Sequence, residues 1–275
     1  MVIRRVCLDA FGTVFSPRTP VFDQYASVAR SYGLSVDGGK VKDGFKRAFK
    51  QWLKTHPLYG KHSSPPLEPT AWWAGVIGDT FRFAGVSQQE LAPVEDNLAN
   101  SLVQRFWGEE GYSLHSEFPA FLDSLRSLGI PPPSIVSNTD PALVRILDNL
   151  GVSERRIGAK GILKEEIFTT WALEKEKQEV GFWHDVLKKL DETSGKGERL
   201  KPEEVLVVGD ELIADYETPR QAGMQSLLLR RLKPGEGHAN PSYLDEQNGQ
   251  KPDVQAVRNL SEVIEWIKKE NGRIK

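Results

Sequence analysis

Short apolar runs alternate with longer amphipathic segments along much of this chain. Four runs, over residues 2–8, 134–137, 205–209 and 225–229, have the length and apolar character of buried strands. Between them apolar residues recur at helix spacing, as over 117–129, where a glycine closes the segment. Strands that alternate with helices predict an α/β fold, with a mostly parallel sheet and helices on both faces.

The stretch 17–111 differs from the rest, because every regular pattern in it has helix spacing. One expected helix begins with a capping-box pattern at Ser87 and runs towards Phe106. Prolines and glycine over 56–69 predict a loop, and 15–20 predicts a linker that leaves the strand region. The chain therefore divides into two units, a core of 1–16 with 112–275 and a helical insert of 17–111.

Polar residues follow three of the predicted strands directly. Asp9 ends the first run, Ser137 and Asn138 end the second, and Asp210 ends the third, while Gly12 predicts a tight loop after Asp9. Ligands bind at the carboxyl ends of strands in open α/β sheets, so these side chains lie where chemistry is usually placed. Each could instead cap a helix or form a turn.

These pieces resemble, in order, the motifs of the haloacid dehalogenase (HAD) superfamily. Asp9-x-x-Gly12-Thr13 resembles motif I, Ser137-Asn138 motif II, and Gly209-Asp210 with the later Asp215 motif IV. Motif III supplies a lysine, for which Lys175 and Lys177 both qualify. Spacing to Trp183 favours Lys177, alignment of the Glu-Lys pair permits Lys175, and neither is followed by the proline of close relatives.

Within the superfamily the chain most resembles the eukaryotic group of haloacid dehalogenase-like hydrolase domain-containing protein 3, which shares the Trp72-Trp73 pair. The resemblance implies a Rossmann-like HAD core with a helical cap, here 17–111, inserted after the first strand and lying over the active site. The loop at 56–69 carries His56, Tyr59, Lys61 and His62 and could approach the mouth of that site, or could be exposed without a role.

The family pattern also assigns roles to single residues. Asp9 would be the nucleophile, and Mg²⁺ would be held by Asp9, Asp210 and the backbone carbonyl of Phe11. Thr13, Ser137 and a lysine would bind the three equatorial phosphate oxygens, and Asn138 and Lys177 complete the expected catalytic set. Asp215 would be either a metal ligand or an ion-pair partner that orients Lys177.

Phe11 is the main departure from the phosphatase pattern. Phosphatases of the superfamily usually have a second aspartate two residues after the nucleophile, which acts as general acid and base. Phenylalanine has no proton to donate, and haloacid dehalogenases carry an aromatic residue here. Three readings follow: a Mg²⁺-dependent phosphatase of reduced scope, a catalytically weak HAD-fold protein that serves as a binding module or scaffold, or a 2-haloacid dehalogenase.

Net charge and composition restrict the classes of binding partner and the compartment that the sequence predicts. A net charge of −2 gives no electrostatic case for nucleic acid or a membrane surface, so a small phosphorylated substrate is the expected partner and no protein partner can be named. The single cysteine, Cys7, fits a reducing compartment, and a cytoplasmic or nuclear location is the default expectation. Glycine, proline and asparagine over 231–251 predict a partly disordered segment.

Overall fold

The computed structural model describes residues 2–193, 199–231 and 254–272. Apart from Arg231, the segment that the sequence predicts to be partly disordered, 231–251, lies outside these residues. Within the described parts, no helix combines the length and the apolar character needed to cross a membrane. The architecture below therefore concerns the described residues alone.

Six described strands form one parallel sheet in the order β5-β4-β1-β6-β7-β8, which confirms the predicted α/β fold. The strands are β1 (Arg5–Leu8), β4 (Ser134–Ser137), β5 (Ile167–Thr169), β6 (Val205–Gly209), β7 (Gln225–Leu229) and β8 (Ala256–Val257). Because β1 lies between β4 and β6, with Leu8 opposite Ile135 and Val208, the residues that follow these three strands meet at one edge.

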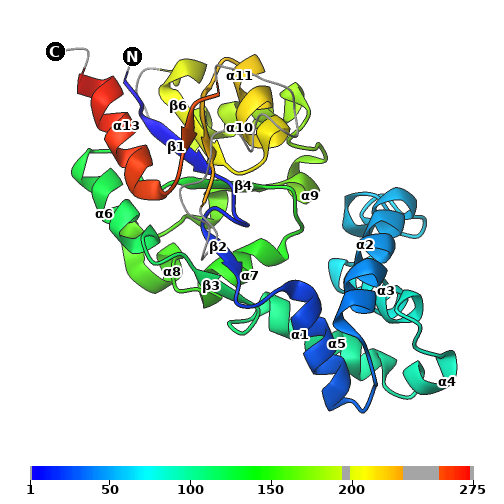
Figure 1. The fold of residues 1–275 in the computed structure, drawn as a ribbon. Helices are drawn as coiled ribbons and strands as arrows, with labels where there is room; N and C mark the ends of the chain where they lie inside the picture. Colours follow the sequence, from blue (N-terminus) through cyan, green and yellow to red (C-terminus); the bar gives the residue numbers. More distant parts are fainter. Residues whose placement is uncertain (1, 194–198, 232–253, 273–275) are drawn as a thin grey trace.

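Helices cover both faces of the sheet (Figure 1). Alternate residues of β1 explain this, because Val6 and Leu8 pack in one apolar cluster and Cys7 packs in another. The first cluster includes residues of α6 (Phe118–Ser127), α7 (Ala142–Asn149) and α13 (Leu260–Gly272), and the second includes residues of α10 (Val180–Thr193). Shorter elements of the core are α8 (Glu154–Ile157), η2 (Gly158–Lys160), η3 (Lys164–Glu166), α9 (Thr170–Leu173), η4 (Pro202–Glu204), the π-helical η5 (Leu212–Glu217) and α11 (Thr218–Gln221).

The helical insert leaves and re-enters the core through a two-stranded antiparallel ribbon. Its strands are β2 (Phe15–Pro17) and β3 (Tyr112–Leu114), and between them lie α1 (Val21–Ser31), α2 (Gly38–Thr55), η1 (Leu58–Gly60), α3 (Pro69–Phe83), α4 (Gln88–Leu91) and α5 (Glu95–Trp107). These helices form the lobe at the lower right of Figure 1 and have their own apolar clusters. We call this lobe the cap; the domain boundaries at 16/17 and 111/112 stay a prediction.

Two local expectations were wrong. Residues 15–17 form strand β2 where the sequence predicts a linker, because a strand of three residues is too short to show alternation. The helix expected from Ser87 to Phe106 is two helices, α4 and α5. The capping box at Ser87 is present, but Pro93 lacks the N–H that a continuous helix needs.

Candidate active site

Asp9 extends from the end of β1 into a pocket at the carboxyl edge of the sheet. Gly12 turns the chain beside it with a φ of 77°, and a Cβ on Gly12 would lie only 2.6 Å from Asp210 Oδ2. A glycine is therefore needed both for the backbone angle and for the close approach of the two loops. Carboxylate oxygens of Asp9, Asp210 and Asp215 lie within 4.8 Å of one another, so the ends of β1 and β6 and the following η5 bring three acidic side chains together.

Lys177 neutralises part of this acidic cluster. Its Nζ donates to Asp9 Oδ1 at 2.6 Å and to Asp215 Oδ1 at 2.7 Å, and the side chain is only 2% exposed. Lys175 lies on the surface, where it pairs with Asp185. Of the two lysines that the sequence leaves open, the structure thus brings Lys177 to Asp9.

The segment before α10 is fixed by hydrogen bonds on both sides of Lys177. The backbone N–H of Lys177 donates to Asn138 Oδ1 at 3.0 Å, and the indole of Trp183 donates to the Lys177 carbonyl at 2.8 Å. Trp183 is fully buried between the helix and the sheet. This contact gives a physical reason why spacing to Trp183 indicated the lysine that the structure brings to Asp9, in the absence of the expected proline.

Burial and charge pull the ionisation of these groups in opposite directions. Burial raises the pKa of Asp9 to about 7, assisted by Asp215 and opposed by Lys177. For Lys177, burial disfavours the charged form, but Asp9 and Asp215 together outweigh it and raise its pKa above the ordinary value. Lys177 therefore stays protonated, and the pKa of Asp9 lies close to neutral pH.

Asp215 is engaged at both oxygens. Oδ1 accepts from Lys177, and Oδ2 accepts from the backbone N–H of Glu211 at 3.0 Å. Gly209 permits this position, because a Cβ there would lie 2.3 Å from the Asp215 carboxyl carbon. Of the two roles that the sequence left open for Asp215, the geometry favours the ion pair that orients Lys177.

Ser137 and Asn138 line the same pocket as Asp9, Lys177 and Asp210. Thr13 is the exception among the residues assigned to the site, because it is fully buried and does not line the pocket. Its hydroxyl has no hydrogen-bond partner among the described residues. The phosphate-binding role of Thr13 stays a prediction.

The side chain and the backbone carbonyl of Phe11 have different surroundings. The ring turns towards the cap and packs edge-on against Phe15 and Tyr112, with centroids 4.8 and 5.5 Å apart. No described group donates a hydrogen bond to its backbone carbonyl or to Asp9 Oδ2. Asp9, Phe11 and the exposed Asp210 line the same pocket, and carboxylate and carbonyl oxygens are the hard donors that suit a divalent cation such as Mg²⁺.

Comparison with known proteins identifies the family of the chain. A model of the haloacid dehalogenase-like hydrolase family matches residues 3–223. The chain belongs to the haloacid dehalogenase-like hydrolases. This hydrolase is 30% identical over 242 residues to an uncharacterized protein of Saccharomyces cerevisiae, YMR130W, with 82% of this chain and 71% of that protein covered.

Two further comparisons concern a second relative and the fold. It is 28% identical over 229 residues to haloacid dehalogenase-like hydrolase domain-containing protein 3 of Danio rerio, with 83% and 86% of the two chains covered. Its fold is similar to that of the HAD-hydrolase YfnB from Bacillus subtilis, solved bound to magnesium. That match has a TM-score of 0.60 and 14% identity, and it covers 98% of this chain and 100% of that one.

The structure adds two contacts of the hydrolase that the sequence motifs do not contain. Arg231 donates from Nε to the Gly12 carbonyl at 2.8 Å and from Nη2 to the Thr13 carbonyl at 2.7 Å, and it pairs with Glu117. It thus holds the loop after Asp9 in place. One arginine at the start of a segment rich in glycine, proline and asparagine has no sequence pattern that could have indicated this.

The cap loop after α2 also contacts the core beside the pocket. Tyr59 donates its hydroxyl proton to the Asn138 carbonyl at 2.8 Å, and both Lys61 and His62 pair with Glu174, at 2.7 and 3.0 Å. The sequence indicated this loop by its polar residues between turn residues. It lies against the motif II loop, so of the two readings of 56–69 the geometry favours contact with the site.

Proposed function

We propose that this hydrolase is a Mg²⁺-dependent phosphatase that uses Asp9 as its nucleophile and acts on phosphates whose leaving groups need little protonation. The observation that carries the proposal is the placement of Lys177, buried between Asp9 and Asp215 beside the exposed carboxylate of Asp210. A buried cation among three carboxylates leaves one free oxygen on Asp9 and a cation site next to it. This arrangement suits attack on an anion that the carboxylates alone would repel.

The chain supplies each part of a displacement at phosphorus. One carboxylate oxygen of Asp9 attacks phosphorus, the bond from phosphorus to the leaving oxygen breaks, and the leaving group departs with the electron pair. Lys177 Nζ and the polar groups of Ser137 and Asn138 face the pocket in which the equatorial oxygens would lie. Water then attacks the aspartyl phosphate, which releases inorganic phosphate and restores Asp9. Mg²⁺, when bound by Asp9, Asp210 and the Phe11 carbonyl, would neutralise charge on the phosphoryl oxygens.

Phe11 limits the substrates. Its ring packs among Phe15 and Tyr112 at the position where a general acid would protonate the leaving oxygen. Without that acid, leaving groups that carry negative charge well, such as acyl and aryl oxygens, are favoured over sugar or nucleoside alkoxides. General acid–base help is worth about 10²–10⁴-fold, so the restriction is severe.

The test is formation of a covalent phosphate mimic. Purified protein with Mg²⁺ and beryllium fluoride is expected to form one adduct per chain, seen by ¹⁹F NMR, and to hydrolyse acetyl phosphate. Asp9→Asn keeps the side-chain shape but is a poor nucleophile, so both adduct and turnover should disappear while the fold is retained. An adduct of unchanged yield in Asp9→Asn would contradict the proposal.

The aromatic residue in place of the acid favours one second candidate. A haloacid dehalogenase-like hydrolase without an acid could be kept as a binding module or scaffold, since a fold does not dictate a function. The same experiment separates the two. Neither adduct nor acetyl phosphate turnover in a folded, Mg²⁺-loaded wild type would favour the binding protein.

A further inference from the structure

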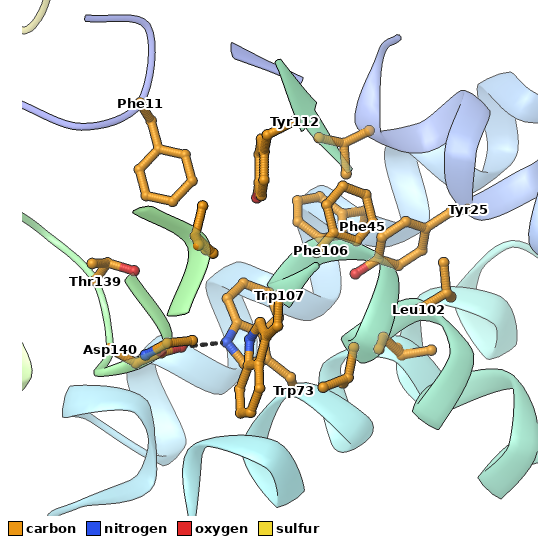
Figure 2. A pocket seen from close by; sticks show the side chains of 15 residues that line it. Phe11, Tyr25, Phe45, Trp73, Leu102, Phe106, Trp107, Tyr112, Thr139 and Asp140 are labelled. Atoms are coloured by element: carbon orange, nitrogen blue, oxygen red, sulfur yellow. Dashed lines mark hydrogen bonds between the residues drawn. The ribbon is translucent and has the colours of Figure 1, made fainter. Parts of the chain in front are cut away.

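A cavity of about 110 Å³ lies between the core and the cap, on the far side of Phe11 from the acidic cluster. Figure 2 shows Phe11, Thr139 and Asp140 of the core along one side, and Tyr25 and Leu102 of the cap along the other. Seven of its 15 lining residues carry aromatic rings, so its wall is mainly ring faces and ring edges. The proposed phosphatase does not use this cavity in the steps described above.

The lining of the cavity is unfavourable for a phosphate group. Asp140 is the one charged residue of the lining, and both of its oxygens are used, Oδ1 by the backbone N–H of Ala142 at 2.7 Å and Oδ2 by the indole of Trp73 at 2.6 Å. No lysine, arginine or histidine is among the described residues of the wall. An anion would meet a carboxylate and apolar rings, so the cavity suits an uncharged, apolar group.

Two phenol hydroxyls line the cavity and offer it polar groups. Tyr25 is 2% and Tyr112 9% exposed, and neither phenol hydroxyl forms a hydrogen bond with a described residue. Both residues line the cavity, and Figure 2 shows their oxygens turned towards its interior. Neither oxygen is among the fully buried side-chain atoms that lack a partner, so a water or a ligand atom in the cavity can reach both hydroxyls.

Phe11 connects this cavity to the active site. Phe11 lines both this cavity and the pocket that contains Asp9, Lys177 and Asp210. A ligand whose phosphate lies at Asp9 could therefore extend its substituent past the Phe11 ring into the cavity. The edge-on contact of Phe11 with Tyr112 shows the kind of ring packing that such a substituent would meet.

We propose that this cavity binds the leaving group of the substrate, and that this group is a single aromatic ring, so the substrates are aryl phosphates. The inference rests on the proposed phosphatase function and names its substrate class. Volume sets the upper limit on ring size: cavities of about 150 Å³ lined by apolar side chains bind benzene, and this one is somewhat smaller. Fused ring systems are therefore excluded, and the many hydroxyls of a sugar would lack partners.

The test compares ligands that share one anionic group and differ in the substituent. Methyl-, phenyl- and 1-naphthylphosphonate are not hydrolysed, and their affinities can be measured by calorimetry with saturating Mg²⁺. Wild type is expected to bind phenylphosphonate about tenfold or more tightly than methylphosphonate, because the ring becomes buried. The naphthyl compound should show no such gain. Equal affinities for methyl and phenyl, tight binding of naphthyl, or no binding of any of the three would overturn the inference.

A filled cavity gives a second measurement. Ala142→Leu places three more carbon atoms against the cavity wall and should reduce the preference for phenyl over methyl to about twofold or less. Ala120→Leu, on the exposed face of α6, is the matched control and should keep the wild-type preference. A preference retained in a folded Ala142→Leu protein would overturn the inference, and the wild-type series alone decides if this variant does not fold.

Failure of this inference can be told from failure of the proposed function. Acetyl phosphate has a good leaving group and no ring, so its hydrolysis and the beryllium fluoride adduct test the chemistry alone. Turnover of acetyl phosphate without a phenyl preference overturns the ring site and leaves the phosphatase. A phenyl preference that Ala142→Leu removes, in a protein that forms no adduct, supports the ring site and overturns the phosphatase.

Discussion

The two sides of Phe11 contrast strongly. On the core side, Lys177 pairs with both Asp9 and Asp215, and all three charged residues are buried. Asp9 follows β1, Lys177 precedes α10 and Asp215 lies in η5. On the cap side, aromatic rings from helices of both units surround a small cavity, and the charge there is a single fully bonded carboxylate, Asp140. The core side depends on charge balance, whereas the cap side depends on shape. A change on one side should therefore alter chemistry and a change on the other should alter selectivity.

Replacement of the buried cation Lys177 should have the largest effect on the stability and the activity of the core side. Lys177→Met keeps most of the side-chain volume but leaves Asp9 and Asp215 without their shared partner. Loss of one member of a buried ion pair costs about 3–5 kcal/mol, so we expect a loss of this size in the free energy of unfolding at pH 8, together with loss of turnover. Urea unfolding and acetyl phosphate hydrolysis measure the two effects.

Lys175→Met is the matched control, since Lys175 pairs with Asp185 on the surface, where an ion pair is worth about 0–1 kcal/mol. The cost of Lys177→Met should also shrink as the pH is lowered through about 7 towards 5, because protonation of Asp9 removes one of the negative charges that Lys177 balances. Equal losses for the two variants would show that Lys177 does not balance the acidic cluster.

The same contrast explains how much the sequence could predict. Strand ends are visible as apolar runs that stop at Asp9, Ser137 and Asp210, and parallel strands place such residues at one edge, so the charged side was predictable. The choice of Lys177 over Lys175 depended on one further observation, its spacing to Trp183, whose buried indole donates to the Lys177 carbonyl. The strands β5 and β8 were not predicted, because runs of three and two residues show no period.

The cap side could not be predicted in the same way. Its wall combines residues as far apart in sequence as Phe11, Trp73 and Ile146, and no local pattern reports a contact between helices of different units. The clamp of Arg231 on the Gly12 and Thr13 carbonyls has the same cause, because it joins residues more than 200 positions apart. Side-chain packing between distant elements is decided by the whole fold.

A carboxylate in place of the Phe11 ring should change the chemistry at the residue that separates the two sides. Phe11→Asp introduces a proton donor next to the leaving oxygen, so turnover of alkyl phosphates should rise by about 10²-fold, the lower end for acid–base catalysis, since the pocket is built around a ring. A plot of log rate against leaving-group pKa should be steep for wild type and flatter for the variant.

Phe11→Asn is the matched control, since it has the same size as aspartate and no acidic proton. It should keep the steep dependence of the wild type. Efficient wild-type turnover of a sugar phosphate, or an equal gain in the asparagine variant, would mean that another group supplies the proton. Glu211 would then be the first to test, because it also lines the pocket.

The charged side should also respond to pH through Asp9 in a predictable direction. Burial raises the pKa of this carboxyl to about 7, whereas the ordinary value is 3.8, so the metal-free folded protein holds a proton on Asp9 that the unfolded chain has lost between these two values. This proton stabilises the fold at low pH, and its contribution declines as the pH rises from about 4 to 7.

Mg²⁺ must displace that proton in order to bind. We therefore expect Mg²⁺ affinity to be constant above about pH 7 and to fall about tenfold for each unit below it, because one proton competes for one ligand. Calorimetric titration of Mg²⁺ from pH 5.5 to 8.5 measures this slope, and proton release in buffers of different ionisation enthalpy counts the protons directly. Asp9→Asn has no proton to displace, so its weaker affinity should lose the slope centred near pH 7. A wild-type affinity that is flat across this range would show that Asp9 is already ionised before the metal arrives, and that Lys177 outweighs the cost of burial.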